Sequence, residues 1–190
     1  MGKSAKKSKS TNKILGFVFL VLIVAALVLV IVGMCVDVLK VTTTVKNILG
    51  GGETEKVVSY NLFGEHWDSF NKLDISNTFL LISFIIAMVG CVALIVDCIL
   101  RVFLKKNFKI FRALGAFITL VGAVLILVAG LVLAGSFNDL GGESGDAIKD
   151  FISNFGAESN WSAATGVWLG FVGGLVGAIA GGAQLAKALN

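Results

Sequence analysis

Four long stretches without a charged residue constrain the fold of this chain more than any other feature. They are Ile14–Val36, Ile75–Val96, Ala113–Asn138 and Ser159–Ala186. A helix rises about 1.5 Å per residue, so about 20 apolar residues cross the roughly 30 Å hydrocarbon core of a bilayer. Lipid offers the backbone no hydrogen-bond partners, so segments that cross it form helices. The sequence therefore predicts an all-α membrane protein, a bundle of four transmembrane helices.

Composition agrees with this assignment, because a soluble domain of 190 residues would not need an apolar content of 56% or a mean hydropathy of +0.92. Each loop between the spans is too short to fold around a large core of its own. The predicted segments are a disordered basic tail over 1–12, spans over 13–36, 75–100, 113–136 and 165–187, outer loops over 37–74 and 137–164, a connector over 101–112 and an end piece over 188–190.

Lysine and arginine lie mainly at alternate ends of these spans. Eleven of them lie in the N-terminal tail, the connector and the C-terminal end, where no acidic residue occurs. The two outer loops hold five lysines against eleven aspartates and glutamates. Positive charge stays on the cytoplasmic side, so both termini and the connector are expected inside and the acidic loops outside. The expected location is the plasma membrane, and the bias toward Lys, Ile, Phe and Asn favours a bacterial cell.

The connector mixes its cations with phenylalanines. Beside two spans, this mixture indicates helix ends in the membrane interface, with the cations on anionic lipid head groups, rather than binding to nucleic acid. The expected head-group contacts are Lys105, Lys106, Lys109 and Arg112. Asp97 and Arg101 lie one helical turn apart, and this spacing predicts an ion pair between them at the interface.

The first outer loop has the composition of a β-hairpin. Residues 41–48 are rich in β-branched side chains, residues 56–63 alternate in polarity, and the glycines of 50–52 lie in a turn between them. Val58, Tyr60 and Leu62 fall on one face of the second strand. A lone hairpin is marginal in water, so this one must pack on the second outer loop, another subunit or a partner.

The second outer loop contains a short amphipathic helix over 146–155. Its phenylalanine face either packs on the hairpin or is exposed as a contact site for a partner. The residues of the two outer loops expected to contact a partner are Tyr60, Leu62, Phe63, Trp67, Phe151 and Phe155.

The sequence contains no arrangement of residues typical of catalysis or metal binding. His66 is the only histidine, and no second histidine or loop cysteine completes a tight metal site around it. The stretch Gly142–Asp146 has aspartate where a nucleophile turn requires glycine. We therefore expect no enzymatic activity, no cofactor and no metal.

The fourth span carries small residues at helical spacing, which lets helix backbones approach closely. Two neighbouring stripes contain Gly166, Gly170, Gly174, Ala178 and Gly182, and Gly173, Gly177 and Gly181. These residues pack either inside the bundle or between subunits of a homo-oligomer, and the sequence leaves both interpretations open.

Four spans, internal termini and a longer, β-like first outer loop resemble the claudin and peripheral myelin protein type of tetraspan. Residues 60–64, with Trp67 beyond them, lie roughly where that family carries a Gly-Leu-Trp motif, although the order differs here and the family's pair of loop cysteines is absent. The resemblance implies an adhesion, scaffold or accessory-subunit role built on the outer loops.

Two hypotheses for function follow. The first is a structural or interaction protein that recognises partners, including other membrane proteins, through its outer loops and associates laterally through its glycine-rich helix faces. The alternative is a channel or transport component in which several copies surround a pore. The spans hold few polar residues that would line a wide aqueous path.

Overall fold

The computed structural model describes residues 3–46, 53–63, 74–104, 108–139 and 157–189. Its elements, in chain order, are α1 (Lys3–Cys35), β1 (Asp37–Lys46), β2 (Glu53–Asn61), α2 (Asp74–Leu104), α3 (Lys109–Asp139), β3 (Ala157–Ala163) and α5 (Thr165–Leu189). The amphipathic helix predicted over 146–155 lies outside the described residues.

Four helices in the described part of the chain are long and apolar enough to cross a membrane, which confirms the prediction of a multi-pass membrane protein. The spans are Ile14–Cys35, Asn77–Leu104, Lys109–Gly135 and Thr165–Lys187. The second and third spans extend into the predicted connector, because α2 continues to Leu104 and α3 begins at Lys109. The connection between them is therefore much shorter than the predicted 101–112.

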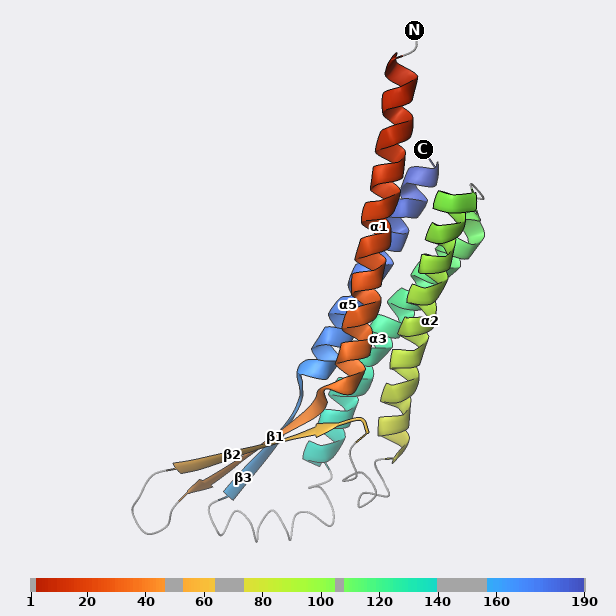
Figure 1. Ribbon diagram of the computed structural model, residues 1–190. Coiled ribbons are helices and arrows are strands. Elements are labelled where there is room, and N and C mark those ends of the chain that lie inside the picture. The colour runs from red at the N-terminus through yellow and green to blue at the C-terminus, as the bar shows by residue number, and fades with distance from the viewer. Residues whose placement is uncertain (1–2, 47–52, 64–73, 105–107, 140–156, 190) are drawn as a thin grey trace.

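The helices form a bundle in which each packs on two neighbours that run in the opposite direction (Figure 1). Helix α1 packs on α5 and α2, and α3 packs on α2 and α5. The N- and C-termini lie at one end of the bundle with the adjoining ends of α2 and α3, and the three strands lie at the other (Figure 1). We call these the termini end and the sheet end.

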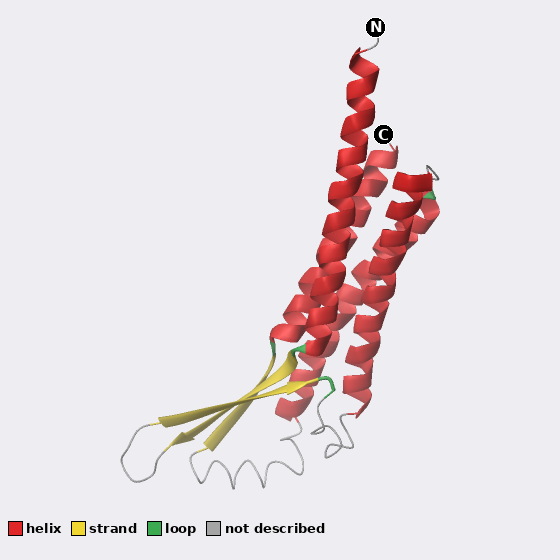
Figure 2. Ribbon diagram, in the orientation of Figure 1, coloured by secondary structure: helices red, strands yellow, loops and turns green. Residues whose placement is uncertain are grey.

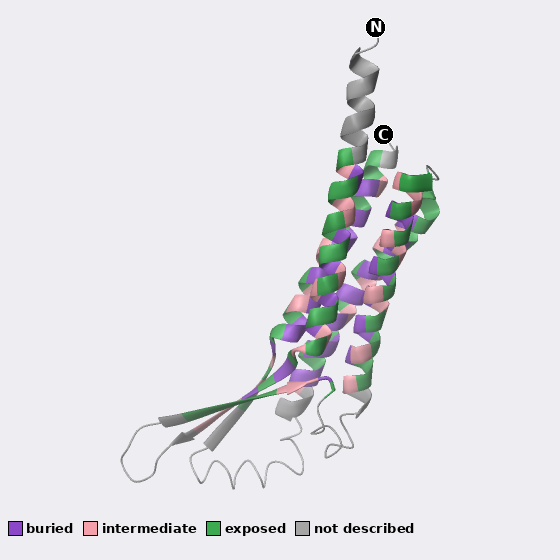
Figure 3. Ribbon diagram, in the orientation of Figure 1, coloured by how far each residue is buried: buried purple, intermediate pink, exposed green. Residues whose placement is uncertain are grey.

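Burial separates the inner and outer faces of the helices (Figure 3). One buried cluster, which includes Phe84, Ile126 and Leu133, extends to the strands, and a second surrounds Ile23 and Leu94. The outer faces remain apolar: Val21, Phe117 and Ile179 are all more than half exposed. Exposed apolar surface over whole helices is unfavourable in water and suits contact with lipid.

The first helix begins earlier than the sequence predicts. Helix α1 starts at Lys3, so the prediction of a disordered tail over 1–12 is wrong for residues 3–12. A helix that already exists extends without a new nucleation step, and no glycine or proline interrupts residues 3–13. The first span therefore continues past the bundle as one helix (Figure 2).

The strands form one antiparallel sheet in the order β2-β1-β3. The predicted hairpin is confirmed as β1 and β2, which pair from Lys46 with Glu53 to Asp37 with Asn61. Strand β3 was not predicted from the sequence. It pairs with the other edge of β1, from Val45 opposite Ala157 to Leu39 opposite Ala163. The second loop thus supplies the support that a lone hairpin lacks.

Pairing sorts the side chains of the sheet onto two faces. Leu39, Val41 and Trp161 lie on the face toward the bundle, while Lys40 and Ser59 lie on the opposite face. The register shifts between Asp37 and Leu39, and this bulge adds Val38 to the buried cluster. The part of the sheet next to the helices therefore packs one face on the buried cluster, and the strands project beyond the bundle (Figure 1).

Candidate functional site

The glycine stripes of α5 pack against other helices of the same chain. A methyl group built on Gly173 would lie 2.8 Å from the carbonyl oxygen of Ala26 on α1. One built on Gly174 would lie 2.7 Å from the Cβ of Ala123 on α3. Such short distances leave no room for any side chain larger than hydrogen.

The other members of the stripes follow the same pattern, with one exception. Each of these residues lies against another element or is buried: Gly166, Gly170, Gly177, Ala178 and Gly181. Gly182 is exposed, and nothing lies within 4 Å of a Cβ built on it. Packing inside the bundle therefore accounts for the stripes, and these faces are not free for lateral association with a second copy. Only Gly182 remains on the outside.

Glycines in the other spans make equally close contacts. Gly33 of α1 faces Gly166, with 2.6 Å between a Cβ built on Gly33 and the carbonyl oxygen of Gly166. Gly122 of α3 faces the backbone of Ala87 on α2, at 2.5 Å from its nitrogen. Single glycines among leucine, valine and isoleucine give no repeating pattern, which is why sequence reasoning missed Gly33 and Gly122.

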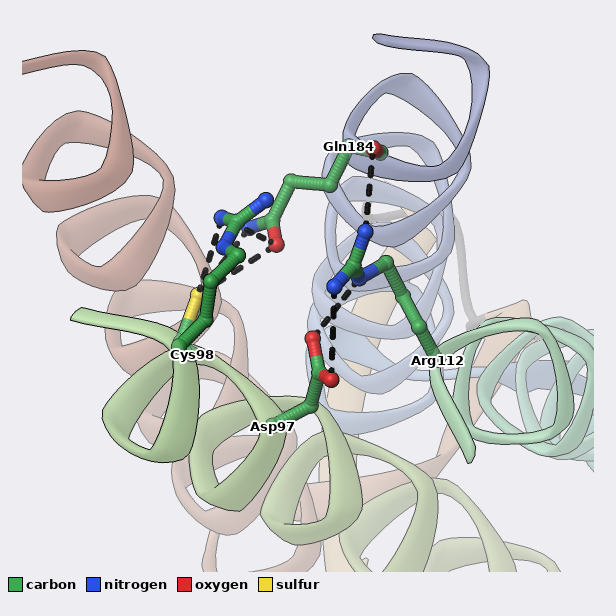
Figure 4. Close-up of polar contacts among 5 residues, drawn as sticks. Asp97, Cys98, Arg112 and Gln184 are labelled. Carbon is green, nitrogen blue, oxygen red and sulfur yellow. Dashed lines mark hydrogen bonds and ion pairs between the residues drawn. The ribbon is translucent and has the colours of Figure 1, made fainter. Parts of the chain in front are cut away.

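A buried ion pair joins α2 to α3 near the termini end (Figure 4). Arg112 Nε donates to Asp97 Oδ2 at 2.7 Å, and Arg112 Nη2 lies 3.4 Å from Asp97 Oδ1. The side chains of both residues are fully or almost fully buried, with 0% and 1% exposed. The guanidinium also donates through Nη1 to the backbone oxygen of Gln184 on α5, at 3.3 Å. Three helices therefore meet at Arg112.

The side chain of Gln184 extends this group toward α2 (Figure 4). Its Oε1 accepts a hydrogen bond from Arg101 Nη2 at 2.9 Å, and its Nε2 lies 3.1 Å from the sulfur of Cys98. Arg101 Nη2 also lies 4.0 Å from that sulfur. We call Asp97, Cys98, Arg101, Arg112 and Gln184 the polar cluster.

The polar cluster corrects two predictions. Asp97 on α2 pairs with Arg112 on α3 and not with Arg101, because Arg112 offers it two guanidinium nitrogens in a buried position. Arg112 is buried inside the bundle, so its expected contact with lipid head groups is wrong. Both outcomes depend on how α2 and α3 are rotated against each other, which residue spacing along one helix cannot reveal.

Of the remaining predicted head-group contacts, one lies within the described residues, Lys109 at the start of α3. Lys109 is exposed, and Lys105 and Lys106 lie outside the described residues. Large apolar side chains at the end of α2 and the start of α3 are also exposed: Phe103, Leu104, Phe108, Ile110 and Phe111. This combination of cations and exposed apolar groups is typical of helix ends in a membrane interface.

The residues predicted to contact a partner differ in how far they are exposed. The rings of Tyr60 and Trp161 stack across β1, with centroids 5.9 Å apart, and both pack on the buried cluster. Leu62 is buried, so it belongs to the core and not to a contact surface. Phe63 is 62% exposed and remains available. Trp67, Phe151 and Phe155 lie outside the described residues.

Placing a charge at Tyr60 should loosen the sheet. Tyr60→Asp removes the stacked ring and sets a carboxylate against the apolar cluster, which is unfavourable without a partner. We expect the strands to be cut faster by protease while insertion into the membrane is unchanged. Val57→Asp serves as the control, because Val57 is exposed. Equal protease resistance of the two variants would show that the Tyr60 face is not held against the bundle.

Within the described residues, no group of three or more His, Cys, Asp and Glu side chains is placed to hold a metal ion. His66 lies outside them. Asp97 and Arg112 neutralise each other between α2 and α3, and what the described geometry offers is binding surface at the two ends of the bundle.

The resemblance to claudin and peripheral myelin protein type tetraspans, which rests on the number of spans and a β-like first loop, stays a prediction. Comparison of the chain with protein-family models and with curated proteins gave no match.

Proposed function

We propose that this protein is a structural or interaction protein of the plasma membrane that binds a partner through its sheet on the outer side of the membrane. The observation that carries the proposal is the attachment of the sheet. Val38, Leu39 and Leu62 are buried in the same cluster as the helices. The sheet is thereby a fixed extension of the bundle and not a loosely tethered loop.

Continuity of the backbone adds to this rigidity. Strand β1 follows α1 after a single residue, and β3 leads into α5 through Ala164. The amide of Ala164 donates to the carbonyl oxygen of Val38 at 2.9 Å, which joins the two connections. A surface held this way binds a partner with little loss of conformational entropy, and such preorganisation favours recognition.

The face of the sheet away from the bundle has the composition of a binding surface. Its exposed residues are mainly polar: Lys40, Ser59, Asn160 and Ser162, with Val57 as an apolar addition, and the exposed Phe63 follows the end of β2. Mixed polar surface with an exposed aromatic anchor is common where proteins meet. The uneven distribution of lysine and arginine supports the outer position of this face.

The contacts inside the bundle disfavour the alternative of a channel. Ser83 donates to the carbonyl oxygen of Phe79 at 2.7 Å, and Thr119 donates to that of Gly115 at 2.8 Å. These hydroxyls are thus used within their own helices. The outer faces of the spans, which would line a pore between several copies, expose apolar side chains. We therefore favour the interaction protein.

A membrane-impermeant crosslinker that joins thiols to amines tests orientation and binding together. Cysteine is introduced at Ser59 on the sheet or at Lys109 near the termini end, in a Cys35→Ser background, because Cys35 is exposed. On intact cells we expect Ser59→Cys to react and to form one discrete crosslinked species. Lys109→Cys, the matched control, should not react.

The outcomes separate the two parts of the proposal. Reaction at Lys109 without reaction at Ser59 would reverse the orientation. Reaction at Ser59 without a crosslinked species would contradict partner binding by the sheet. A crosslinked species that persists after the further change Phe63→Ser would exclude Phe63, which is exposed and not needed for folding, as the anchor.

A further inference from the structure

The polar cluster has an unequal number of charges. It contains two guanidinium groups, Arg101 and Arg112, and one carboxylate, Asp97. Both oxygens of Asp97 lie within 3.4 Å of Arg112, so that carboxylate is already neutralised. Among the described residues no aspartate or glutamate forms an ion pair with Arg101. One positive charge is therefore left over.

Arg101 is held in place while part of its hydrogen-bonding capacity is unused. Its Nη2 donates to Gln184 Oε1 at 2.9 Å and makes a long contact with the sulfur of Cys98. A guanidinium carries five N–H donors in a planar fork, so most of them remain for another acceptor. The side chain is half-buried, which keeps it partly accessible. Its planar fork matches the oxygens of a phosphate.

The depth of Arg101 corresponds to the edge of the membrane. It lies three residues before Leu104, the last residue of the second span, and this is about 4.5 Å along a helix. Three apolar side chains at the same end of the bundle are exposed: Phe103, Phe111 and Ile110, of which Ile110 is 86% exposed. In water these side chains would be unfavourably placed, whereas acyl chains next to phosphates would cover them.

We propose that Arg101 binds the phosphate of an anionic phospholipid where α2 and α5 come together at the termini end. The lipid phosphate neutralises the charge left over in the polar cluster, and its acyl chains lie at the level of the exposed apolar side chains of the same end of the bundle. A free phosphate ion would satisfy the charge and leave those apolar groups uncovered. This assignment does not depend on which partner the sheet binds.

The site differs from the general attraction of lipid head groups to exposed lysines. Lys109 is exposed, and a solvated ammonium binds head groups weakly and interchangeably. Arg101 is half-buried and oriented by Gln184, so it selects one acceptor in one position. The site should therefore hold a single lipid through purification.

Native mass spectrometry of the full chain in detergent tests this site with phosphatidylglycerol as the probe and phosphatidylcholine for comparison. We expect the unmodified protein to bind one phosphatidylglycerol in preference to phosphatidylcholine. Arg101→Gln should weaken phosphatidylglycerol binding by about tenfold or more, the size expected for loss of a charged hydrogen bond. Arg101→Lys, which retains the charge and loses the fork, should lie between them. Lys109→Gln removes an exposed charge at the same end and should bind like the unmodified protein.

Three results would overturn the proposal. The first is that Arg101→Gln and Arg101→Lys fold and bind phosphatidylglycerol as the unmodified protein does. The second is that Lys109→Gln weakens binding as much as Arg101→Gln, which would indicate that diffuse surface charge attracts the lipid. The third is that inorganic phosphate raises the unfolding temperature of the protein as much as phosphatidylglycerol does, which would identify a soluble anion as the ligand.

Discussion

Arg112→Met should destabilise the protein by about 3–5 kcal/mol, because removing one member of a buried ion pair leaves the other charge without a partner. Asp97, which is 1% exposed, would then be buried without its two contacts to the guanidinium. The bond from Arg112 to the backbone of Gln184 would also be lost. Thermal unfolding of the full chain in detergent measures the effect.

Removing both charges should restore most of this loss. In Asp97→Leu/Arg112→Met, no charge of the pair remains to be compensated, and a buried ion pair is often equivalent to apolar side chains of similar volume. Lys109→Met removes a positive charge one turn earlier on α3, where the side chain is exposed, and should change little. If Arg112→Met were as stable as Lys109→Met, the pair would contribute nothing to the fold.

Gly174→Leu should destabilise the packing of α5 against α3. Even its Cβ would lie 2.7 Å from the Cβ of Ala123, so the helices must move apart. Overpacking of this kind typically costs about 1–3 kcal/mol. We expect the monomer in detergent to unfold at a lower temperature.

Gly182→Leu is the matched control, because it is the same substitution on the same helix with nothing within 4 Å. It should leave the unfolding temperature nearly unchanged. A Gly174→Leu protein that stays intact as a monomer but no longer forms crosslinked oligomers would place this face between subunits. Identical behaviour of the two variants would show that the glycine spacing is incidental.

The spans and the hairpin were predictable because their signals are local. An uncharged stretch defines a span without reference to any other part of the chain, and β-branched residues define β1 in the same way. Strand β3 was not predictable, because Ala157–Ala163 is mostly small and polar and lacks β-branched residues. It is a strand because β1 offers it an edge.

Side-chain pairing in the polar cluster was not predictable from local sequence either. Asp97 and Arg101 have the spacing of an ion pair on one helix, yet Asp97 pairs across to α3. Which arginine pairs with Asp97 depends on the rotation of α2 about its axis. That rotation is fixed by close contacts such as that of Gly122 with Ala87. The glycine stripes of α5 predicted close packing, but not which helices would fill them.

The position of β1 in the middle of the sheet has a consequence for the order in which the protein is made. Strand β2 follows β1 almost at once, whereas β3 begins 111 residues after β1 ends. At about 5–20 residues per second, a ribosome needs roughly 5–20 s to reach it. During that interval one edge of β1 is unpaired, and it is covered only after β3 has been synthesised. A chain terminated before β3 would therefore carry an open strand edge that quality-control proteases and chaperones can recognise.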